Sequence, residues 1–263
     1  GWHIECSAMS RTHLGKTIDL HCGGQDLIFP HHENEIAQSE CCNGVPFAHY
    51  WLHNGYINVD NKKMSKSLNN FFTVRDVAKE YGYEPIRFFL ISSSYRSPIN
   101  YSTEIVQQGI GALDRLYNCK NAMAFGLKNA PEGAEDAAFA ERVEARRAQF
   151  IAAMDDDLNT ADGIAALFEL VKDINLMLAD GTATAATIRR GQALFDELTD
   201  VLGFCYARQE AGSDDKEIEA LIEARTVARK EKNWAEADRI RDELTAKGIV
   251  LEDTPQGVKW RRA

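Results

Sequence analysis

The sequence lacks the features that would assign it to a membrane or a secreted class of protein. No apolar run reaches the roughly 18–20 residues that a membrane span needs, and no charged-then-apolar signal segment opens the chain. Its six cysteines are few for 263 residues, irregularly spaced and free of any Cys-x-x-Cys pair, which argues against a disulfide scaffold. We therefore expect a cytoplasmic protein with reduced thiols, in which Cys119 and Cys205 are small core residues.

The chain also lacks an excess of positive charge. Lys and Arg together number 30 against 40 Asp and Glu, so the formal net charge is −10. Such a chain is not a non-specific polycation, and any contact with nucleic acid has to come from a local basic patch. Hydrophobic residues make up 44% of the chain and charged residues 27%. This balance is ordinary for a soluble globular protein and argues against wholesale disorder.

Hydrophobic patterns predict mixed α/β structure in the first 60 residues. Residues 2–6 and 17–21 alternate like short strands, and residues 50–59 favour another strand with a break at Asn54-Gly55. Between them, Phe29-Pro30-His31 is expected to open a helix, because proline suits the first helical position.

From about residue 73, where Thr73 is a candidate cap, the spacing becomes helical nearly to the end. Apart from a loop expected at 126–135, the connections between these amphipathic helices are short, which favours an antiparallel bundle. Residues 206–214 are polar and predict a linker. Two helices and a hairpin are expected beyond it.

Residues 29–35 hold a candidate metal motif. His31 and Glu35 are four residues apart and share one helix face. Imidazole nitrogen and carboxylate oxygen are both zinc ligands. Cys6, expected at the end of the strand over 2–6, would add a thiolate. A polar helix start exposed to solvent is the alternative interpretation of the same spacing.

The strongest short signal is Lys63-Met64-Ser65-Lys66-Ser67, on a polar stretch that follows a strand. Two lysines and two hydroxyls on an exposed, mobile loop can clamp a triphosphate, because their charges meet the negative charge that develops as pyrophosphate leaves. A solvated basic loop is the alternative. Gly15-Lys16-Thr17 is not a P-loop, since Ser10 stands where that motif requires glycine.

Through these motifs the sequence resembles the class I aminoacyl-tRNA synthetases, and closely the cysteinyl-tRNA synthetase family. The segments that carry the resemblance are 1–9, 21–26, 29–35, 63–67, 95–97, 154–160 and the tail 248–262. The chain opens on Gly1 with a motif already under way, so we interpret it as the C-terminal part of a longer protein. The first half of that protein would carry the His-x-Gly-His motif and one more zinc-binding cysteine, and this fragment is not expected to be active alone.

The resemblance implies a cysteine–tRNA ligase. Such an enzyme activates L-cysteine with ATP and Mg, transfers cysteine to tRNA(Cys), and holds one zinc ion per full-length subunit. Cys6, His31 and Glu35 match the zinc ligands, and Trp2 matches the tryptophan beside the amino-acid pocket. Lys63 and Lys66 match the catalytic lysines. The implied ATP-binding residues are Gly23, Gly24, Asp26, Met64, Ser65, Lys66 and Ser67, and the implied anticodon contacts are Arg229, Trp234, Asp238 and Asp253.

The implied fold class is α/β plus mainly α. Its parts are a partial Rossmann-like catalytic domain (1–60), a connecting segment with the signature loop (61–100), a helical bundle (101–205), the linker (206–214) and a small C-terminal α/β unit that reads the anticodon (215–263). A cytoplasmic monomer without membrane contact is expected.

Two positions depart from the family pattern, since Cys22 and Asn69 replace glycines. Cys22 is expected to crowd the nucleotide pocket. Asn69 tolerates positive φ and should be a mild change.

Physical chemistry supports a zinc-dependent choice of cysteine. Cysteine and serine differ by one atom, so packing discriminates them weakly, whereas zinc favours thiolate sulfur over a hydroxyl that stays protonated.

Two rivals remain open. One is a related ligase that joins cysteine to an amino-sugar, against which residues 215–263 argue, and the other is a non-catalytic tRNA- or zinc-binding module.

In the C-terminal unit the expected basic patch contains Arg225, Arg229, Lys230, Lys232, Lys259, Arg261 and Arg262. Trp234 and Trp260 lie among these charges, with core packing the alternative role for each.

Overall fold

The structure is a computed structural model of the chain. It describes all residues except 60–61, 65–71, 180, 207–212, 255–256 and 263. The chain divides into two compact units, one formed by Gly1–Arg115 with Ala148–Ala166 and the other by Leu116–Arg147 with Leu167–Ala263. Within the described residues, no helix is both long and apolar enough to span a membrane.

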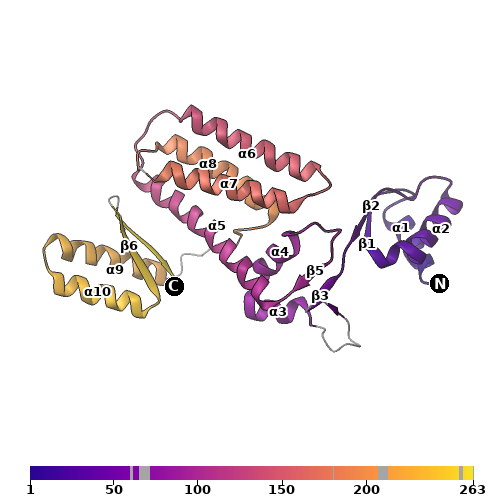
Figure 1. Cartoon of the computed structure of the whole chain (residues 1–263), viewed down its shortest axis with the longest axis horizontal. Coiled ribbons are helices and arrows are strands. Elements are labelled where there is room, and N and C mark those ends of the chain that lie inside the picture. The colour runs from indigo at the N-terminus through magenta and orange to yellow at the C-terminus, as the bar shows by residue number, and fades with distance from the viewer. Residues whose placement is uncertain (60–61, 65–71, 180, 207–212, 255–256, 263) are drawn as a thin grey trace. The chain divides into compact units, whose positions relative to one another are not determined.

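The first unit opens with a small α/β layer (Figure 1). Its elements are α1 (His3–His13), β1 (Ile18–Gly24), the short turns η1 (Gln25–Leu27) and η2 (Ile28–His32), α2 (Glu33–Asn43) and β2 (Ala48–Asn54). β1 and β2 pair in parallel from Ile18↔Ala48 to Gly24↔Asn54. Parallel strands need a crossover, and α2 supplies it, ending at Gly44 with φ of 70°.

The predicted strand over residues 2–6 is wrong, because this segment begins α1. Its alternation does not mark one buried face, since Trp2 and Ile4 are both largely exposed. The helix instead contacts α2 through polar groups: the Ser7 hydroxyl is buried and donates to Oε1 of Gln38 at 3.2 Å. Pro30 is likewise not at the first position of an α-helix but inside η2, and α2 begins three residues later.

The connecting part of the first unit combines a small sheet with two helices. Its strands are β3 (Ile57–Val59), β4 (Lys62–Lys63) and β5 (Ile99–Tyr101), in the order β4-β3-β5, and its helices are α3 (Val74–Tyr81) and α4 (Tyr83–Ile91). The break predicted at Asn54-Gly55 is confirmed, because it separates β2 from β3. The predicted cap is also confirmed: Thr73 and Asp76 form a reciprocal capping box.

The helical region consists of α5 (Thr103–Asn129), α6 (Ala137–Asp155), α7 (Thr160–Leu178) and α8 (Ala185–Leu202). In the second unit, the fully buried side chains include Leu116, Met123, Phe139, Leu167, Leu170, Ile174, Phe195 and Leu198. Cys119 and Cys205 are buried as predicted, and burial raises the pKa of the Cys119 thiol to about 12. The loop predicted to begin at residue 126 begins later, because α5 continues to Asn129.

The C-terminal part pairs two helices with a hairpin (Figure 1). They are α9 (Ser213–Lys230), α10 (Trp234–Ala246), β6 (Ile249–Thr254) and β7 (Gly257–Arg262), the two strands being antiparallel. The core residues of this part are Ile218, Ile222, Ile240, Leu244 and Ile249. Asn233 caps α10 by accepting from the Glu236 amide. The α/β plus mainly α fold class is therefore confirmed.

Candidate metal centre and nucleotide site

Glu35 on α2 is a fully buried carboxylate, with 0% of its side chain exposed. A buried charge is costly unless it is paired. Two histidines approach it: Nε2 of His21 lies 2.6 Å from Oε2, and Nε2 of His31 lies 3.0 Å from Oε1. The His31 contact lacks hydrogen-bond geometry, so Oε1 is a buried polar atom without a hydrogen-bond partner. The carboxylate therefore keeps a lone pair free for a cation.

The structure brings together the three residues proposed as zinc ligands. The Cys6 sulfur, a His31 ring nitrogen and a Glu35 carboxylate oxygen all lie within 4.8 Å of one another. Cys6 reaches this point from α1 rather than from the end of a strand. Donor atoms of His21, His32 and Glu35 also lie within 4.8 Å of one another, so the Glu35 carboxylate belongs to both groups. Sulfur, imidazole and carboxylate donors at such spacing suit zinc.

Burial governs the protonation of two groups at this centre. The pKa of the Cys6 thiol is raised, first by burial and then by its contact with the Glu35 carboxylate. The pKa of the His32 imidazole is lowered, first by burial and then by the charge of His21. Both shifts favour neutral groups around one buried carboxylate, so a bound cation would take the place of a thiol proton.

Sequence reasoning missed most of the histidines here. Five of the chain's seven histidines form one histidine cluster, made up of His3, His21, His31, His32 and His53. Nδ1 of His3 lies 2.7 Å from Nδ1 of His31, and Nδ1 of His32 lies 2.8 Å from Nε2 of His53. The Trp2 ring lies 4.5 Å from that of His31. The sequence does carry one signal for this cluster, which is the concentration of histidine, because all seven histidines fall in the first 53 residues.

The glycines at the end of β1 are required by close packing. A Cβ on Gly23 would lie 2.6 Å from Cε1 of His32, and a Cβ on Gly24 would lie 2.6 Å from Oδ1 of Asp26. Gly23, Gly24 and Asp26 thus meet at the carboxyl end of a parallel strand. That end is where open α/β sheets bind their ligands.

Replacing Gly23 by alanine is expected to destabilise the first unit. The new methyl group would meet the His32 ring, which is itself held against His53 at 2.8 Å. We expect a loss of about 1–3 kcal/mol in the free energy of unfolding, measured by urea denaturation. Gly111→Ala is the matched control, because no atom lies within 4 Å of the added Cβ and the residue is in α5. Equal stability of the two variants would contradict this packing.

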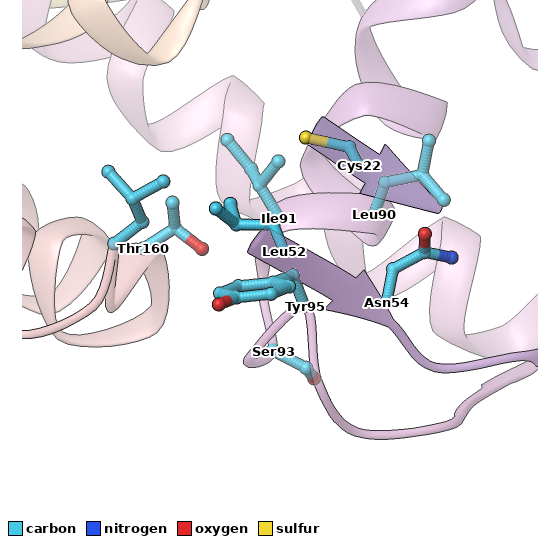
Figure 2. Close-up of a pocket in the computed structure, with 9 residues that line it drawn as sticks. Cys22, Leu52, Asn54, Leu90, Ile91, Ser93, Tyr95 and Thr160 are labelled. Carbon is cyan, nitrogen blue, oxygen red and sulfur yellow. The ribbon is translucent and has the colours of Figure 1, made fainter. Parts of the chain in front are cut away.

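A mostly apolar pocket of about 260 Å³ is lined by Cys22 of β1, whereas the neighbouring His21 faces the histidine cluster. Its lining residues are Cys22, Leu52, Asn54, Leu90, Ile91, Ser93, Tyr95, Leu158 and Thr160 (Figure 2). Cys22 and Leu52 are register partners on β1 and β2 and face this pocket, whereas His21, one residue earlier on β1, contacts Glu35. Cys22 thus lines a cavity beside the glycines.

The proposed phosphate-clamp residues are only partly described. β4 contains Lys63, whose side chain lies outside the described residues, as do Ser65, Lys66 and Ser67 altogether. The backbone amide of Met64 donates to the Ile57 carbonyl at 3.2 Å, which attaches the start of this segment to β3.

The proposed anticodon contacts fall on α9, α10 and β6. Arg229 is in the last turn of α9. Trp234 begins α10 with 59% of its surface exposed, and Asp238 is exposed at 3.4 Å from Arg241. The side chains of Asp253 and Trp260 lie outside the described residues. Arg225 was expected in the basic patch, but it is buried, so that expectation is wrong.

Three family models match successive segments of the chain. A model described as the tRNA synthetases class I (C) catalytic domain matches residues 1–110. A DALR domain matches residues 149–206, and a cysteinyl-tRNA ligase anticodon binding domain matches residues 215–261.

Two curated relatives match the chain from end to end. The cysteine–tRNA ligase of Symbiobacterium thermophilum is 53% identical over 266 residues, which is 100% of this chain and 56% of that protein. The cysteine–tRNA ligase of Anoxybacillus flavithermus is 53% identical over 267 residues, with the same 100% and 56% coverage. The chain thus spans a little over half the length of these relatives.

Two solved structures share the fold at low identity. A ternary complex of Agrobacterium radiobacter K84 agnB2 LeuRS with tRNA and LeuAMS has a TM-score of 0.55 and 19% identity, covering 72% of this chain and 28% of that one. Mycobacterium tuberculosis methionyl-tRNA synthetase in complex with methionyl-adenylate has a TM-score of 0.54 and 18% identity, covering 70% and 40%. The fold is therefore that of the class I aminoacyl-tRNA synthetases. Within that class the chain matches the C-terminal portion of cysteinyl-tRNA synthetase, and the resemblance predicted from its motifs is confirmed.

Proposed function

We propose that this chain is part of a cysteine–tRNA ligase that activates L-cysteine with ATP and Mg and transfers it to tRNA(Cys). The observation that carries the proposal is the meeting of Cys6, His31 and Glu35 within 4.8 Å, around a buried carboxylate oxygen that lacks a hydrogen-bond partner. A family match supports it, because the relatives named above are cysteine–tRNA ligases.

The donor set fits zinc, and we propose that Cys6, His31 and Glu35 hold it together with a ligand from outside this chain. When bound, zinc supplies a soft Lewis acid that prefers the substrate thiolate to the hydroxyl of serine. The chain's own residues orient the centre: His21 fixes one Glu35 oxygen at 2.6 Å, and His3 fixes the His31 ring at 2.7 Å. Trp2, 4.5 Å from the His31 ring, is proposed to line the amino-acid pocket.

ATP is proposed to bind where β1 ends. Gly23 and Gly24 let the His32 ring and the Asp26 carboxylate pack closely against the end of β1. Asp26 would offer its carboxylate to a ribose hydroxyl there. Lys63, Met64, Ser65, Lys66 and Ser67 would close over the phosphates and stabilise the charge on departing pyrophosphate.

We propose that the helical bundle and the C-terminal unit position tRNA, with the domain boundaries given in the sequence analysis. Arg229, Trp234, Asp238 and Asp253 would contact anticodon bases, and the exposure of Trp234 supports stacking. Carboxylates at such a surface suit base amino groups, because phosphate would repel them. A cytoplasmic monomer is part of the same proposal.

Trp234→Ala is expected to weaken cysteine transfer to tRNA while leaving cysteine activation unchanged. Loss of one stacking aromatic costs about 1–3 kcal/mol, so KM for tRNA should rise about 5- to 150-fold. Val227→Ala is the control, because it truncates another exposed apolar side chain, on α9. Equal loss of both activities, or loss of neither, would overturn the anticodon assignment.

The function is tested by amino-acid-dependent exchange of pyrophosphate into ATP, in a polypeptide of the relatives' length that contains this chain. We expect exchange with cysteine and almost none with serine. No exchange with cysteine in the presence of zinc and Mg would contradict the proposal. Attachment of cysteine to an amino-sugar rather than to tRNA would establish the rival ligase, against which the match to an anticodon binding domain argues.

A further inference from the structure

The turn between α6 and α7 has an uncommon backbone. Asp157 and Leu158 have φ of 54° and 55°, and they are the only consecutive non-glycine residues with positive φ in the described part of the chain. L residues pay for this left-handed conformation in steric strain, and asparagine and aspartate tolerate it better than leucine. Such strain persists where the surrounding structure holds it, and it gathers at functional segments.

Two neighbouring side chains hold the Asp157 carboxylate. The Tyr95 hydroxyl donates to Oδ1 at 2.9 Å, and Nε of Arg96 lies 2.7 Å from Oδ2. Nε of Arg96 also donates to the Tyr95 hydroxyl at 3.2 Å. Because the Arg96 and Asp157 side chains are 64% and 47% exposed, their ion pair contributes little to stability. A contribution to global stability therefore does not account for this arrangement.

The loop that contains Tyr95 and Arg96 is fastened to two other segments. The Gly55 amide donates to the Tyr95 carbonyl at 2.8 Å, and Nε2 of Gln25 donates to the Arg96 carbonyl at 2.8 Å. The packing at Gly55 is tight, since a Cβ there would lie 2.5 Å from the Ser97 carbonyl carbon. Gln25 directly precedes Asp26 in η1.

Contacts therefore run without a break from the α6–α7 turn to the end of β1. Asp157 fixes Tyr95 and Arg96, and the backbone of Arg96 fixes Gln25. Figure 2 shows Tyr95 in the middle of this region, between Thr160 at the start of α7 and Asn54 at the end of β2. All these residues belong to the first unit.

We propose that Tyr95, Arg96 and Asp157 form a positioning cluster for the activation step, which sets the segment Gln25–Asp26 relative to the α6–α7 turn. The proposal rests on the function proposed above, because it takes Asp26 as part of the nucleotide site. Arg96 and Asp157 act here through Gln25 and do not touch the reacting atoms.

The test uses three variants in a polypeptide of the relatives' length. Asp157→Asn removes the charge but keeps a residue that tolerates positive φ, so the turn is expected to stay folded. Gln25→Ala removes the donor to Arg96, and the double variant combines the two. Lys79→Ala is the control, because it removes a charge from another exposed ion pair of the first unit, with Asp76 on α3.

Each single variant is expected to lower kcat of cysteine-dependent pyrophosphate exchange about 10-fold, because small misplacement of reacting groups is costly. KM for cysteine should stay unchanged, and Lys79→Ala should match the unmodified protein. Since both substitutions interrupt one chain of contacts, the double variant should fall no more than about twofold below the slower single variant.

A second readout is independent of activity. Amide hydrogen exchange at residues 24–27 should quicken in Asp157→Asn and stay unchanged in Lys79→Ala. A normal kcat together with normal amide hydrogen exchange at residues 24–27 in Asp157→Asn would overturn the proposal. Losses of kcat that multiply in the double variant would also overturn it. If the unmodified protein shows no pyrophosphate exchange, the proposed enzyme function fails, and the hydrogen-exchange result still decides whether the cluster positions residues 24–27.

Discussion

A Glu35→Gln variant is expected to lose tightly bound zinc and, with it, most of its cysteine activation. Glutamine has nearly the same shape but no charge, and it would leave His21 and His31 without the carboxylate that both approach. Losing a partner of a metal ligand already costs 10- to 100-fold in affinity or activity, so losing a ligand should cost at least about 100-fold in each. Zinc content after dialysis against buffered free zinc measures the first effect without relying on turnover.

Glu33→Gln is the matched control for this variant. Glu33 is on the same turn of α2 but is exposed, so its zinc content and its exchange rate should stay normal. If Glu35→Gln retained zinc as tightly as Glu33→Gln, then Glu35 would not be a ligand. The buried carboxylate would in that case serve only to hold His21 and His31.

The second large effect concerns the signature segment. Lys66→Ala is expected to lower the adenylation rate constant by about 100- to 1000-fold, because a cationic group aimed at departing pyrophosphate acts mainly in the transition state. KM for cysteine should change little, which separates lost transition-state stabilisation from lost binding. Single-turnover formation of cysteinyl-adenylate gives the rate constant directly.

Lys62→Ala controls for the loss of one positive charge nearby. Lys62 is on β4 and is exposed, and it is not among the residues proposed to contact ATP. Its adenylation rate should match that of the unmodified protein. A Lys66→Ala variant with the same rate as Lys62→Ala would refute the proposed role of Lys66.

Local sequence signals predicted local structure well. The spacing of His31 and Glu35 indicated a shared approach, and Nε2 of His31 does lie 3.0 Å from Oε1 of Glu35. Thr73 was predicted to cap a helix, and its side chain accepts from a backbone amide in the structure. In each case the partners are three or four residues apart, so helix geometry alone fixes the contact.

Contacts between distant segments could not be predicted in the same way. His21 contacts Glu35, and His32 contacts His53, because β1 and β2 pair in parallel and α2 forms the crossover between them. The alternation in residues 2–6 was misinterpreted as a strand, because five residues are too few to distinguish the hydrophobic period of a strand from that of a helix. Asp157 meets Tyr95 and Arg96 through a turn with positive φ, which no local pattern around Asp157 indicates.

We propose above that this chain is part of an enzyme that attaches cysteine to tRNA. The most direct measurement is the charging of tRNA with labelled L-cysteine by a polypeptide of the relatives' length that contains this chain, in the presence of ATP, Mg and zinc. We expect cysteine to be esterified to tRNA(Cys) and labelled serine not to be. Absence of cysteine charging, or equal charging with serine, would contradict this proposal.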